Sequence, residues 1–576
     1  MRFSSHRSKV SILFSSLALF VLAGTFVFYG ISGRGAHASA ASASSFGGTL
    51  AKIQASGTVN VSSLPTSQVT PTGKARVMVD LARPNGYAPA IAGSRPHTLS
   101  VKVAKGTLLQ NFDGVNAIDS KFVNGFDLEP PDEGLGVGKG YVFNIVNLAG
   151  TIYSTNGTRV VGPFNLNNFF REPAKANLSD PRAFYDKASG AWFSTILEYT
   201  LNAAGTLFTE SHVDIAVNPS GNPTTSWTVY RIDTTNAGGK NPVSDAGCPC
   251  LADYPIFGID QYNVYLSTNE FSSDGRSFNG AQVYAVSKAQ LVSRATTVNY
   301  AHFGSLSVGG TIAYRLQPAT TYGNAPAEYF MNTLDPNGTF DNRIGVWALT
   351  NRANIATGVI PNLSATVVSS EAYANTVNAQ TPAGFNPRFK APTTGLVDAG
   401  GDVMQEIEYI NGHLVGAAQT SVTIAGESVA RDGFAWFDVT PSVAGGVISS
   451  KTHVSRQGYL SLRGEYLLYP HIARSADGTT VVAFSYGGPS TYLSSAYAVL
   501  GVNASNFGDV LTAASGAAPD NGFTGTAKYG GVGRWGDYSA GQLDPTTNNL
   551  WFATQYIAGT GTSLANWSNR VFEVKA

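Results

Sequence analysis

Short runs of alternating apolar and polar residues dominate the chain, and most of them carry an aromatic residue near their start. Clear examples are AWFSTILEY, VYLSTNEF, TVVAFSY and LWFATQY. Alternation with a period of two indicates half-buried β-strands, and aromatic and β-branched residues favour that conformation. Helical periodicity is confined to the short stretch SKAQLVSR. The pattern therefore predicts an all-β protein.

The strand-like runs recur in a fixed order from Asp127 to the C-terminus. An acidic residue opens a short apolar strand, a turn with Asp, Asn or Gly follows, and the aromatic-led strand comes next. Asp132, Asp180, Asp253 and Asp537 open four of these copies. About seven copies of ~64 residues fit this length, compared with ~40–50 residues for an ordinary propeller blade. Radial repetition of short strands is typical of a β-propeller. We predict about seven blades, with six or eight as alternatives, and an N-terminal extension.

Two further positions of the repeat have structural explanations. Aspartates in turns accept hydrogen bonds from turn amides, and large aromatic residues fill the space between packed sheets. We expect these roles for the turn aspartates Asp186, Asp260, Asp477 and Asp544 and for the aromatic residues Trp192, Tyr265, Phe484 and Trp551.

The first 40 residues have the pattern of a secretory signal. Basic residues precede the apolar run VSILFSSLALFVLAGTFVFYGI, and the small residues of GAHASA follow it. This order predicts a cleaved signal peptide at residues 1–40. The apolar run, residues 10–31, is also long enough to remain in the membrane as an anchor. Either way, we expect the rest of the chain to be secreted or held at the outer face of the cell membrane.

Composition divides the remainder into three parts. Residues 41–75 are rich in Ser, Thr, Ala and Gly, which predicts a flexible low-complexity linker. Residues 76–126 contain strand-like patches and predict an extension packed on a propeller that spans residues 127–576. Charged residues make up only 13% of the chain and the formal net charge is zero. This balance argues against nucleic-acid binding, which favours basic surfaces. We expect a monomer.

The two cysteines, Cys248 and Cys250, lie in GCPCLADYP. In an oxidising extracellular compartment, a local disulfide between them is expected. The alternative is a metal or redox site, but metal sites need more ligands and no other cysteine or histidine lies nearby in the sequence. We predict a disulfide that staples one loop.

Several segments together resemble a known group of proteins: PPDEGLGVG, DPRAFYDKASGAWF, GCPCLADYPIFGIDQYNVYLSTNEF, FNGAQVYAVSK and RWGDYSAGQLDPTTNNLWFATQY. The group consists of secreted bacterial β-propeller proteins without a settled function, and it is distantly similar to the sialidase-like (Asp-box) superfamily. The resemblance covers the chain from Asp127 to the C-terminus. It implies a propeller fold and secretion.

Sialidases bind the substrate carboxylate with an arginine cluster and use a Tyr nucleophile, activated by a Glu, with an Asp acid/base. Their Arg-Ile-Pro motif has only a partial counterpart here, FFREPAK, with Arg171 and Pro173. The turns RSADGTTVVAF and TLDPNGTF each depart by one position from the Asp-box pattern Ser-x-Asp-x-Gly-x-Thr-Trp. The near matches indicate propeller turns, and the departures put sialidase catalysis in doubt.

The opening carboxylates are the strongest candidate site. In a propeller, Asp132, Asp180, Asp253 and Asp537 fall on a ring and could line one mouth of the central channel. Such a ring could coordinate Ca²⁺, which takes six to eight oxygen ligands, or bind a cationic or hydroxyl-rich ligand. The structural alternative is that each Asp accepts hydrogen bonds from backbone amides near its strand.

Two arginines flank this ring in the sequence. Arg182 and Arg534 could grip an anionic group, since guanidinium suits bidentate contact with carboxylates, or they could pair with ring aspartates. Trp535 and Tyr538 lie beside Arg534. The predicted ligand-binding set is Asp132, Asp180, Arg182, Asp253, Arg534, Trp535, Asp537 and Tyr538.

These features favour a propeller that binds a carbohydrate or another extracellular ligand at one channel mouth. One alternative is a glycoside hydrolase or lyase of sialidase-like architecture, with catalytic carboxylates among Glu270, Asp253 and Asp537. Glu270 ends an inner strand and could act as a general acid or base if its pKa were raised. The other alternative is a non-catalytic structural protein of the cell surface. We expect His471 to be a packed histidine, and the sequence contains no P-loop, HExxH or Rossmann fingerprint.

Overall fold

The protein is described here from a computed structural model that covers residues 43–78, 106–238, 242–335, 340–560 and 564–575. Contacts divide the chain into two units, residues 1–40 and residues 41–576. The predicted signal peptide or anchor lies outside the described residues. In the part that is described, no helix is long and apolar enough to cross a membrane.

Antiparallel strands form seven successive groups along the chain, so the prediction of an all-β fold is confirmed. The first three groups are β6–β9 (Gly134–Gly138, Tyr141–Val146, Ala149–Ser154, Arg159–Asn165), β10–β13 (Asn177–Asp186, Ala191–Leu201, Phe208–Asn218, Ser226–Asp233) and β14–β17 (Cys250–Ile259, Asn263–Ser272, Phe278–Ser287, Thr297–Val308). The next two are β19–β22 (Gln317–Tyr322, Glu328–Thr333, Asp341–Thr350, Asn362–Tyr373) and β27, β28, β29 and β32 (Ile407–Ile410, His413–Thr423, Ala430–Thr440, His453–Leu460). The last two are β33–β36 (Tyr466–Arg474, Thr480–Gly488, Thr491–Leu500, Leu511–Ala514) and β37–β39 with β4 (Ala540–Asp544, Asn549–Tyr556, Ser568–Lys575, Thr107–Asn116).

Smaller elements complete the regular structure. Three α-helices are present in the described residues: α1 (Ala117–Asn124), α2 (Leu166–Phe170) and α3 (Lys288–Val292). The third lies in the SKAQLVSR stretch, where the sequence predicts helix. The remaining strands are β1 (Ser44–Phe46), β2 (Thr49–Asn60), β3 (Ala75–Val77), β5 (Asp127–Glu129), β18 (Thr311–Ile312), β23 (Ala379–Gln380), β24 (Phe385–Asn386), β25 (Ala391–Pro392), β26 (Leu396–Val397), β30 (Val443–Ala444) and β31 (Val447–Ile448).

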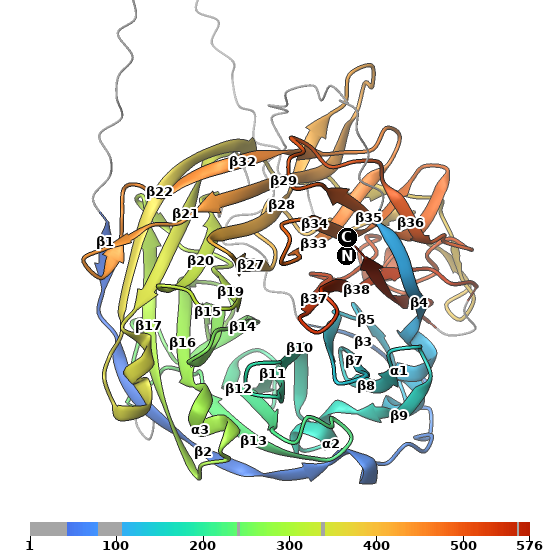
Figure 1. The fold of residues 1–576 in the computed structure, drawn as a ribbon. Coiled ribbons are helices and arrows are strands. Elements are labelled where there is room, and N and C mark those ends of the chain that lie inside the picture. The colour runs from blue at the N-terminus through green and yellow to red at the C-terminus, as the bar shows by residue number, and fades with distance from the viewer. Residues whose placement is uncertain (1–42, 79–105, 239–241, 336–339, 561–563, 576) are drawn as a thin grey trace, which may run out of the picture. The chain divides into compact units, whose positions relative to one another are not determined.

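In Figure 1, the first strands β10, β14, β19, β27, β33 and β37 lie nearer the centre than the later strands of their groups. β6 contacts β10 and β37, β10 contacts β14, and β33 contacts β27 and β37. β19 pairs in parallel with both β14 and β27. A small cavity of about 20 Å³ between them is lined by residues of β6, β10, β14, β19 and β37, including Gly134, Ala183, Phe257, Thr320 and Ala540. The first strands therefore face a common space.

Residues 44–60 correct the prediction of a flexible linker over residues 41–75. β2 pairs antiparallel with β17 through its first half and with β13 through its second half, and β1 pairs with β22. Only Ala51 and Ile53 of β2 bury an apolar side chain well. An edge strand needs little burial, because the unpaired N–H and C=O groups of the neighbouring strands supply its hydrogen bonds. The prediction of a flexible linker from composition is therefore wrong for residues 44–60.

Residues 107–116 refine the prediction of an extension over residues 76–126 that packs on the main body, because they are a paired strand of it. They form β4, which pairs with β39 along most of its length, from Asn116 opposite Ser568 to Thr107 opposite Lys575. β4 is thus the outer strand of the group that contains the last strand of the chain. Residues 79–105 of the predicted extension lie outside the described residues.

The predicted turn and core positions are confirmed. The Asp186 carboxylate accepts hydrogen bonds from the amides of Ala188 and Ser189, and Asp260 accepts from those of Tyr262 and Asn263. Asp477 and Asp544 bind turn amides in the same way. The four aromatic side chains are fully buried in clusters between sheets: Trp192, Tyr265, Phe484 and Trp551.

Candidate functional site

A backbone irregularity recurs in the first strands and places the side chains of the site. The antiparallel register shifts in β10, β14 and β33, each time at a residue followed by proline. The residues before these prolines have positive φ angles: 56° at Asp180, 55° at Tyr254 and 52° at Tyr469. A bulge of this kind re-aims side chains next to it.

The bulge corrects the alignment inferred from the sequence. Asp180 is equivalent to Tyr254, so Asp253 lies one position earlier in its strand. Because side chains alternate between the two faces of a strand, such a one-residue offset turns the side chain to the other side. Asp253 still lies close enough to Asp180 to raise the pKa of that carboxyl.

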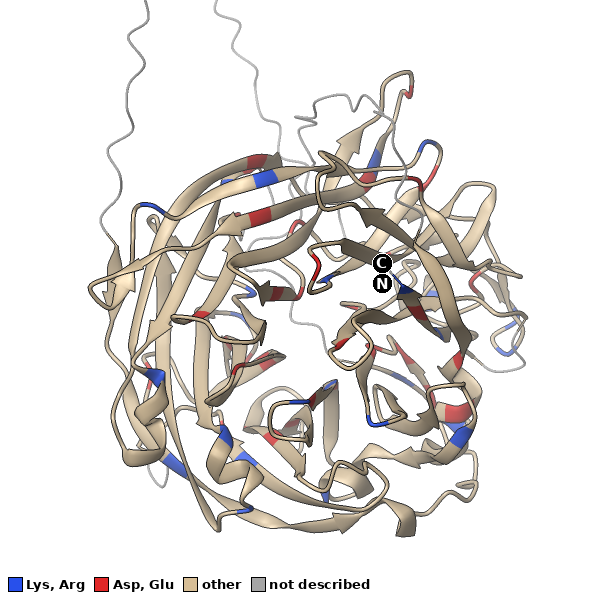
Figure 2. Ribbon diagram, in the orientation of Figure 1, with Lys and Arg blue, Asp and Glu red and all other residues tan. Residues whose placement is uncertain are grey.

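Three of the predicted ring carboxylates meet. One carboxylate oxygen from each of Asp132, Asp180 and Asp537 lies within 4.8 Å of the other two. These residues are 1%, 3% and 6% exposed. They come from the starts of the first, second and seventh strand groups, at what we call the carboxylate end of the inner strands. Acidic and basic residues both occur on the strands around this centre (Figure 2).

Hydrogen bonds connect these groups. The Asp537 amide donates to Asp132 Oδ1 at 2.9 Å, and Asn147 Nδ2 donates to Asp132 Oδ2 at 2.5 Å. Asn147 Oδ1 accepts from the Asp180 amide at 2.9 Å. Asp132 therefore accepts a hydrogen bond from a backbone amide, which is the structural role considered from the sequence. This bond connects the first and seventh strand groups.

The ionisable carboxyl groups of this cluster shift one another's pKa values. Burial, together with the neighbouring carboxylates Asp537 and Asp180, raises the pKa of Asp132 well above its usual range. Burial, Asp253 and Asp537 do the same for the pKa of Asp180. Hard carboxylate oxygens at this spacing suit Ca²⁺. Asp132, Asp180 and Asp537 are the residues that would hold it, with Asp132 already engaged by two donors.

Arg182 crosses from β10 into the centre of the site. Its guanidinium lies 3.1 Å from the centre of the Tyr538 ring and 5.5 Å from that of Tyr254. Arg182 NH1 is 3.3 Å from Glu406 Oε1, in a geometry that is not aligned for a hydrogen bond. Although this side chain is only 5% exposed, none of its three nitrogens hydrogen-bonds to a described residue. Buried guanidinium donors without acceptors are costly.

Glu406 balances this charge. Its other oxygen lies 3.2 Å from His471 Nδ1. Burial alone would raise the pKa of Glu406, but Arg182 and His471 together lower it, so the side chain is ionised. His471 itself is 3% exposed, as expected for a packed histidine.

The two tyrosines of the site are held in their neutral form. The Tyr254 hydroxyl donates to the Asp537 carbonyl at 3.1 Å, and the Tyr538 hydroxyl donates to the Pro181 carbonyl at 3.3 Å. Burial raises the pKa of both phenols, even though Arg182 and Arg315 lower that of Tyr254. Arg315 also lies 3.9 Å from the Tyr254 ring centre. A tyrosine in this state is a poor nucleophile.

Arg534 and Trp535 have different surroundings. Arg534 lies 3.4 Å from Asp537 and 3.8 Å from Asp398, and its side chain remains 15% exposed. Trp535 is buried in a hydrophobic cluster with Val397 and Tyr469. Arg534 therefore contributes its guanidinium to the carboxylate end.

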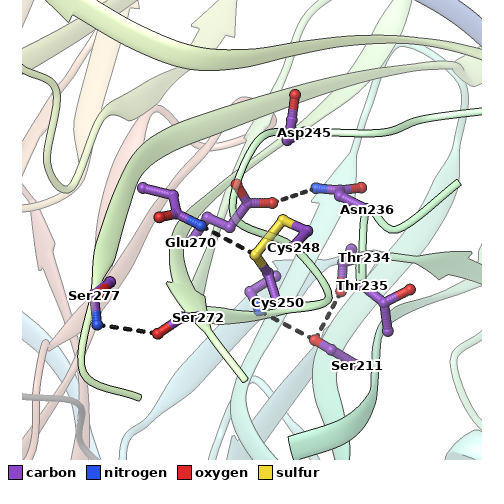
Figure 3. Close-up of a disulfide and its surroundings, with 12 residues drawn as sticks. Ser211, Thr234, Thr235, Asn236, Asp245, Cys248, Cys250, Glu270, Ser272 and Ser277 are labelled. Atoms are coloured by element: carbon purple, nitrogen blue, oxygen red, sulfur yellow. Dashed lines mark hydrogen bonds between the residues drawn. A yellow bond between two sulfur atoms is a disulfide. The ribbon is translucent and has the colours of Figure 1, made fainter. Parts of the chain in front are cut away.

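Two other sequence candidates lie away from these carboxylates. Arg171 ends α2 and donates to the Thr58 carbonyl, in the exposed outer part of the structure. Glu270 lies beside the Cys248–Cys250 disulfide, which the structure contains as expected (Figure 3). Glu270 accepts hydrogen bonds from Asn236 and Gln282. No described contact joins Glu270 to the ring aspartates.

A larger cavity, of about 610 Å³, lies at the opposite, turn end of the inner strands. Its walls come from the turns after β10, β14, β27 and β37, with Tyr185 and Tyr322 among the aromatic residues and Asn324, Asn411 and Asn548 among the amides. Charges here are matched: Lys288 binds the carboxylate of Asp186 at 2.7 Å, and Lys187 Nζ donates to the Pro545 carbonyl at 2.6 Å.

Sequence reasoning missed several members of the carboxylate end. Arg315 and Glu406 lie in the loops just before β19 and β27, which do not repeat the Asp-Pro or Tyr-Pro step of β10 and β14, and Asn147 follows β7 in an otherwise ordinary turn. Tyr254 did carry a signal. Tyr254-Pro255 stands the same distance before the turn residue Asp260 as Asp180-Pro181 stands before Asp186.

Comparisons with known proteins give little further information. No family model and no curated protein matches the chain. Similar solved structures include a protein of unknown function from Dyadobacter fermentans, at 13% identity and a TM-score of 0.32, covering 70% of this chain and 96% of that one. An endo-arabinanase from Bacillus licheniformis is 11% identical, with a TM-score of 0.26, and covers 66% of this chain and 93% of its own. A Trypanosoma rangeli sialidase is 8% identical, with a TM-score of 0.31, over 77% of this chain and 58% of its own. Likeness this remote carries no argument about function.

Proposed function

We propose that this chain is an extracellular, seven-bladed β-propeller that binds a carbohydrate at the carboxylate end of its inner strands. The seven strand groups, the contact between β6 and β37 and the pairing of β4 with β39 support a closed ring. Closure of this kind removes exposed sheet edges. The N-terminal sequence pattern supports secretion or anchoring at the outer face of the membrane. We expect the protein to be a monomer.

The observation that carries the binding proposal is the buried Arg182 guanidinium, whose donors lack hydrogen-bond acceptors while carboxylates gather beside it. A sugar hydroxyl is both donor and acceptor. A polyhydroxylated ligand can therefore accept from Arg182 and donate to Asp180 or Asp537 at the same time. Arg534 and Glu406, whose side chains are 15% and 21% exposed, keep the site in contact with solvent.

A glycan array on the mature chain, followed by calorimetric titration of each binder, tests this proposal. Arg182→Lys keeps the charge but loses the planar donor fork, so it should weaken binding at least about tenfold. Lys187→Ala, at the turn end, is the matched control and should bind like the unmodified protein. Binding lost in Lys187→Ala but retained in Arg182→Lys would move the site to the turn end. Absence of any glycan binder would favour a structural role.

A second candidate is glycoside hydrolysis. It is favoured by the proximity of the Asp180 and Asp537 carboxylates, whose oxygens lie within 4.8 Å. Retaining glycosidases place their two carboxyl groups ~5–5.5 Å apart. The protonated tyrosines argue against a sialidase-type nucleophile. A panel of chromogenic glycosides distinguishes the two functions: turnover that disappears in Asp537→Asn would establish an enzyme, whereas binding without turnover supports the primary proposal.

A further inference from the structure

The Cys248–Cys250 disulfide is asymmetric. Cys248 is partly exposed and Pro249 beside it is exposed, whereas Cys250 is only 2% exposed at the start of β14. The two residues are separated by a single proline, so the bond closes a very small loop. Closing such a loop removes little chain entropy from the unfolded state, and the bond therefore contributes little to stability in the chain-entropy account. An external thiol can reach one sulfur far more readily than the other.

The buried sulfur has a polar partner. Asn279 Nδ2 donates a hydrogen bond to Cys250 Sγ at 3.1 Å, and the Cys250 amide donates to the Thr235 carbonyl at 2.9 Å. A hydrogen-bond donor aimed at sulfur stabilises a thiolate more than a thiol. Cys250 is thus the better leaving group of the two.

Glu270 is buried beside both sulfurs (Figure 3). One of its carboxylate oxygens and the two Sγ atoms all lie within 4.8 Å of one another. Asn236 Nδ2 donates to Oε1 at 2.6 Å and Gln282 Nε2 donates to Oε2 at 2.9 Å. Burial raises the pKa of Glu270 to about 8, with a further rise from Asp245 and an opposing effect of Asn236. The carboxyl group therefore holds a proton near neutral pH.

We propose that Cys248 and Cys250 form a thiol–disulfide exchange site for external thiols, with Glu270 positioned as the proton source for the Cys250 sulfur. An external thiolate attacks Cys248 Sγ and forms a mixed disulfide, while the Cys248–Cys250 bond breaks. Cys250 leaves as a thiolate bound by Asn279 and takes up the proton of Glu270. A second external thiolate then attacks the external sulfur of the mixed disulfide and releases Cys248. Two external thiols are oxidised to one disulfide, and the protein disulfide is reduced to a dithiol.

Single-cysteine variants of the mature chain test the asymmetry. Cys250→Ser leaves the accessible Cys248, and Cys248→Ser leaves the buried Cys250. Cys250→Ser should form a mixed disulfide with oxidised glutathione at least about tenfold faster than Cys248→Ser. Equal rates would overturn the proposal. A second measurement uses the unmodified protein. It is equilibrated with glutathione redox buffers, and its free thiols are counted. Reduction with unchanged circular dichroism is expected, and reduction only after unfolding would show a purely structural disulfide.

The pH dependence of reduction tests Glu270. The titratable groups around it are Asp245, whose pKa burial raises, His302, whose pKa burial lowers to about 3, and Tyr284, whose pKa lies well above its usual range. Of these groups, only Glu270 is expected to titrate near pH 8, and rates are compared per external thiolate because the thiol itself ionises with a pKa of ~8.5. Glu270→Gln should reduce about tenfold more slowly at neutral pH and lose the rate decrease near pH 8. Asp245→Asn is the matched control and should keep that decrease at a slightly lower pH. An unchanged profile in Glu270→Gln would remove Glu270 from the proposed step.

Discussion

The two ends of the inner strands differ in how their charged side chains are paired. β10 begins near Asp180, in a buried cluster of carboxylates and guanidiniums, and ends about 20 Å away at Asp186. Asp186 binds turn amides and Lys288, beside a cavity of about 610 Å³. At the turn end each charge has a local partner, whereas at the carboxylate end like charges are held together. Buried groups whose pKa values are perturbed are common at functional sites.

Glu406 and Glu408 show the same contrast within one segment. Glu406 faces Arg182 and His471, which lower its pKa and keep it ionised. Glu408, two residues further towards the turn end, accepts a hydrogen bond from the Arg474 amide and interacts with Tyr322. Burial raises the pKa of Glu408 to about 8, so it is protonated at neutral pH. The two carboxyls thus have opposite charge states, because only Glu406 has cationic partners.

Glu406→Gln should have the largest effect on this comparison. Removing the carboxylate leaves Arg182 buried without its anionic partner, and breaking a buried pair costs ~3–5 kcal/mol. Urea unfolding at pH 7 measures the loss. Glu408→Gln is the matched control: an amide resembles a protonated acid and no cationic partner is lost, so this variant should not be destabilised at pH 7. Equal losses in the two variants would show that the charge state of Glu406 contributes nothing.

Glu408→Gln should change the pH dependence of stability. The folded-state pKa of Glu408 exceeds its unfolded value, so the folded state binds more protons between about pH 4.5 and pH 8. Stability is therefore lost as pH rises through this window, by up to ~1.4 kcal/mol per pH unit for one proton. The variant should lack this component of the slope in unfolding curves measured at several pH values. A slope identical to that of the unmodified protein would contradict the protonated state of Glu408.

Asp180→Asn should change the free energy of unfolding less, and the direction of the change should depend on whether Ca²⁺ is present. In EDTA at pH 7 the substitution relieves repulsion from Asp253 and Asp537, so stability should rise by about 1 kcal/mol. This gain should vanish well below pH 3.8, the usual pKa of an aspartate, where the carboxyl is protonated in both states. If the carboxylates hold Ca²⁺, added calcium raises the Tm of the unmodified protein and not that of the variant. If added calcium leaves the Tm of both proteins unchanged, a calcium site at Asp180 is excluded.

Lys187→Ala should have the smallest effect. Lys187 is exposed and donates only to a turn carbonyl. Substitutions of this kind usually change stability by less than ~0.5 kcal/mol. Thermal unfolding tests this expectation. A loss of more than ~1 kcal/mol of stability would show that Lys187 makes a stabilising contact beyond its hydrogen bond to the turn carbonyl, and would weaken the contrast between the two ends.

Local chemistry made part of this structure predictable. The period-two alternation, the turn aspartates such as Asp186 and Asp260 and the buried aromatic residues such as Trp192 all follow from rules that act within a few residues. The cysteine pair was predictable for the same reason. The convergence of Asp132, Asp180 and Asp537 was also predicted, because equivalent positions of a repeat come together where the first strands of its units lie side by side.

The sequence by itself therefore determined the fold class, the repeat, its turns and the residue types at the carboxylate end. Only the tertiary structure decided that residues 44–60 and 107–116 are strands, because edge strands take their hydrogen bonds from partners remote in sequence. It also decided that Glu406 is ionised while Glu408 is not. Charge state depends on burial and on neighbours contributed by other strand groups, and neither is encoded within a single strand.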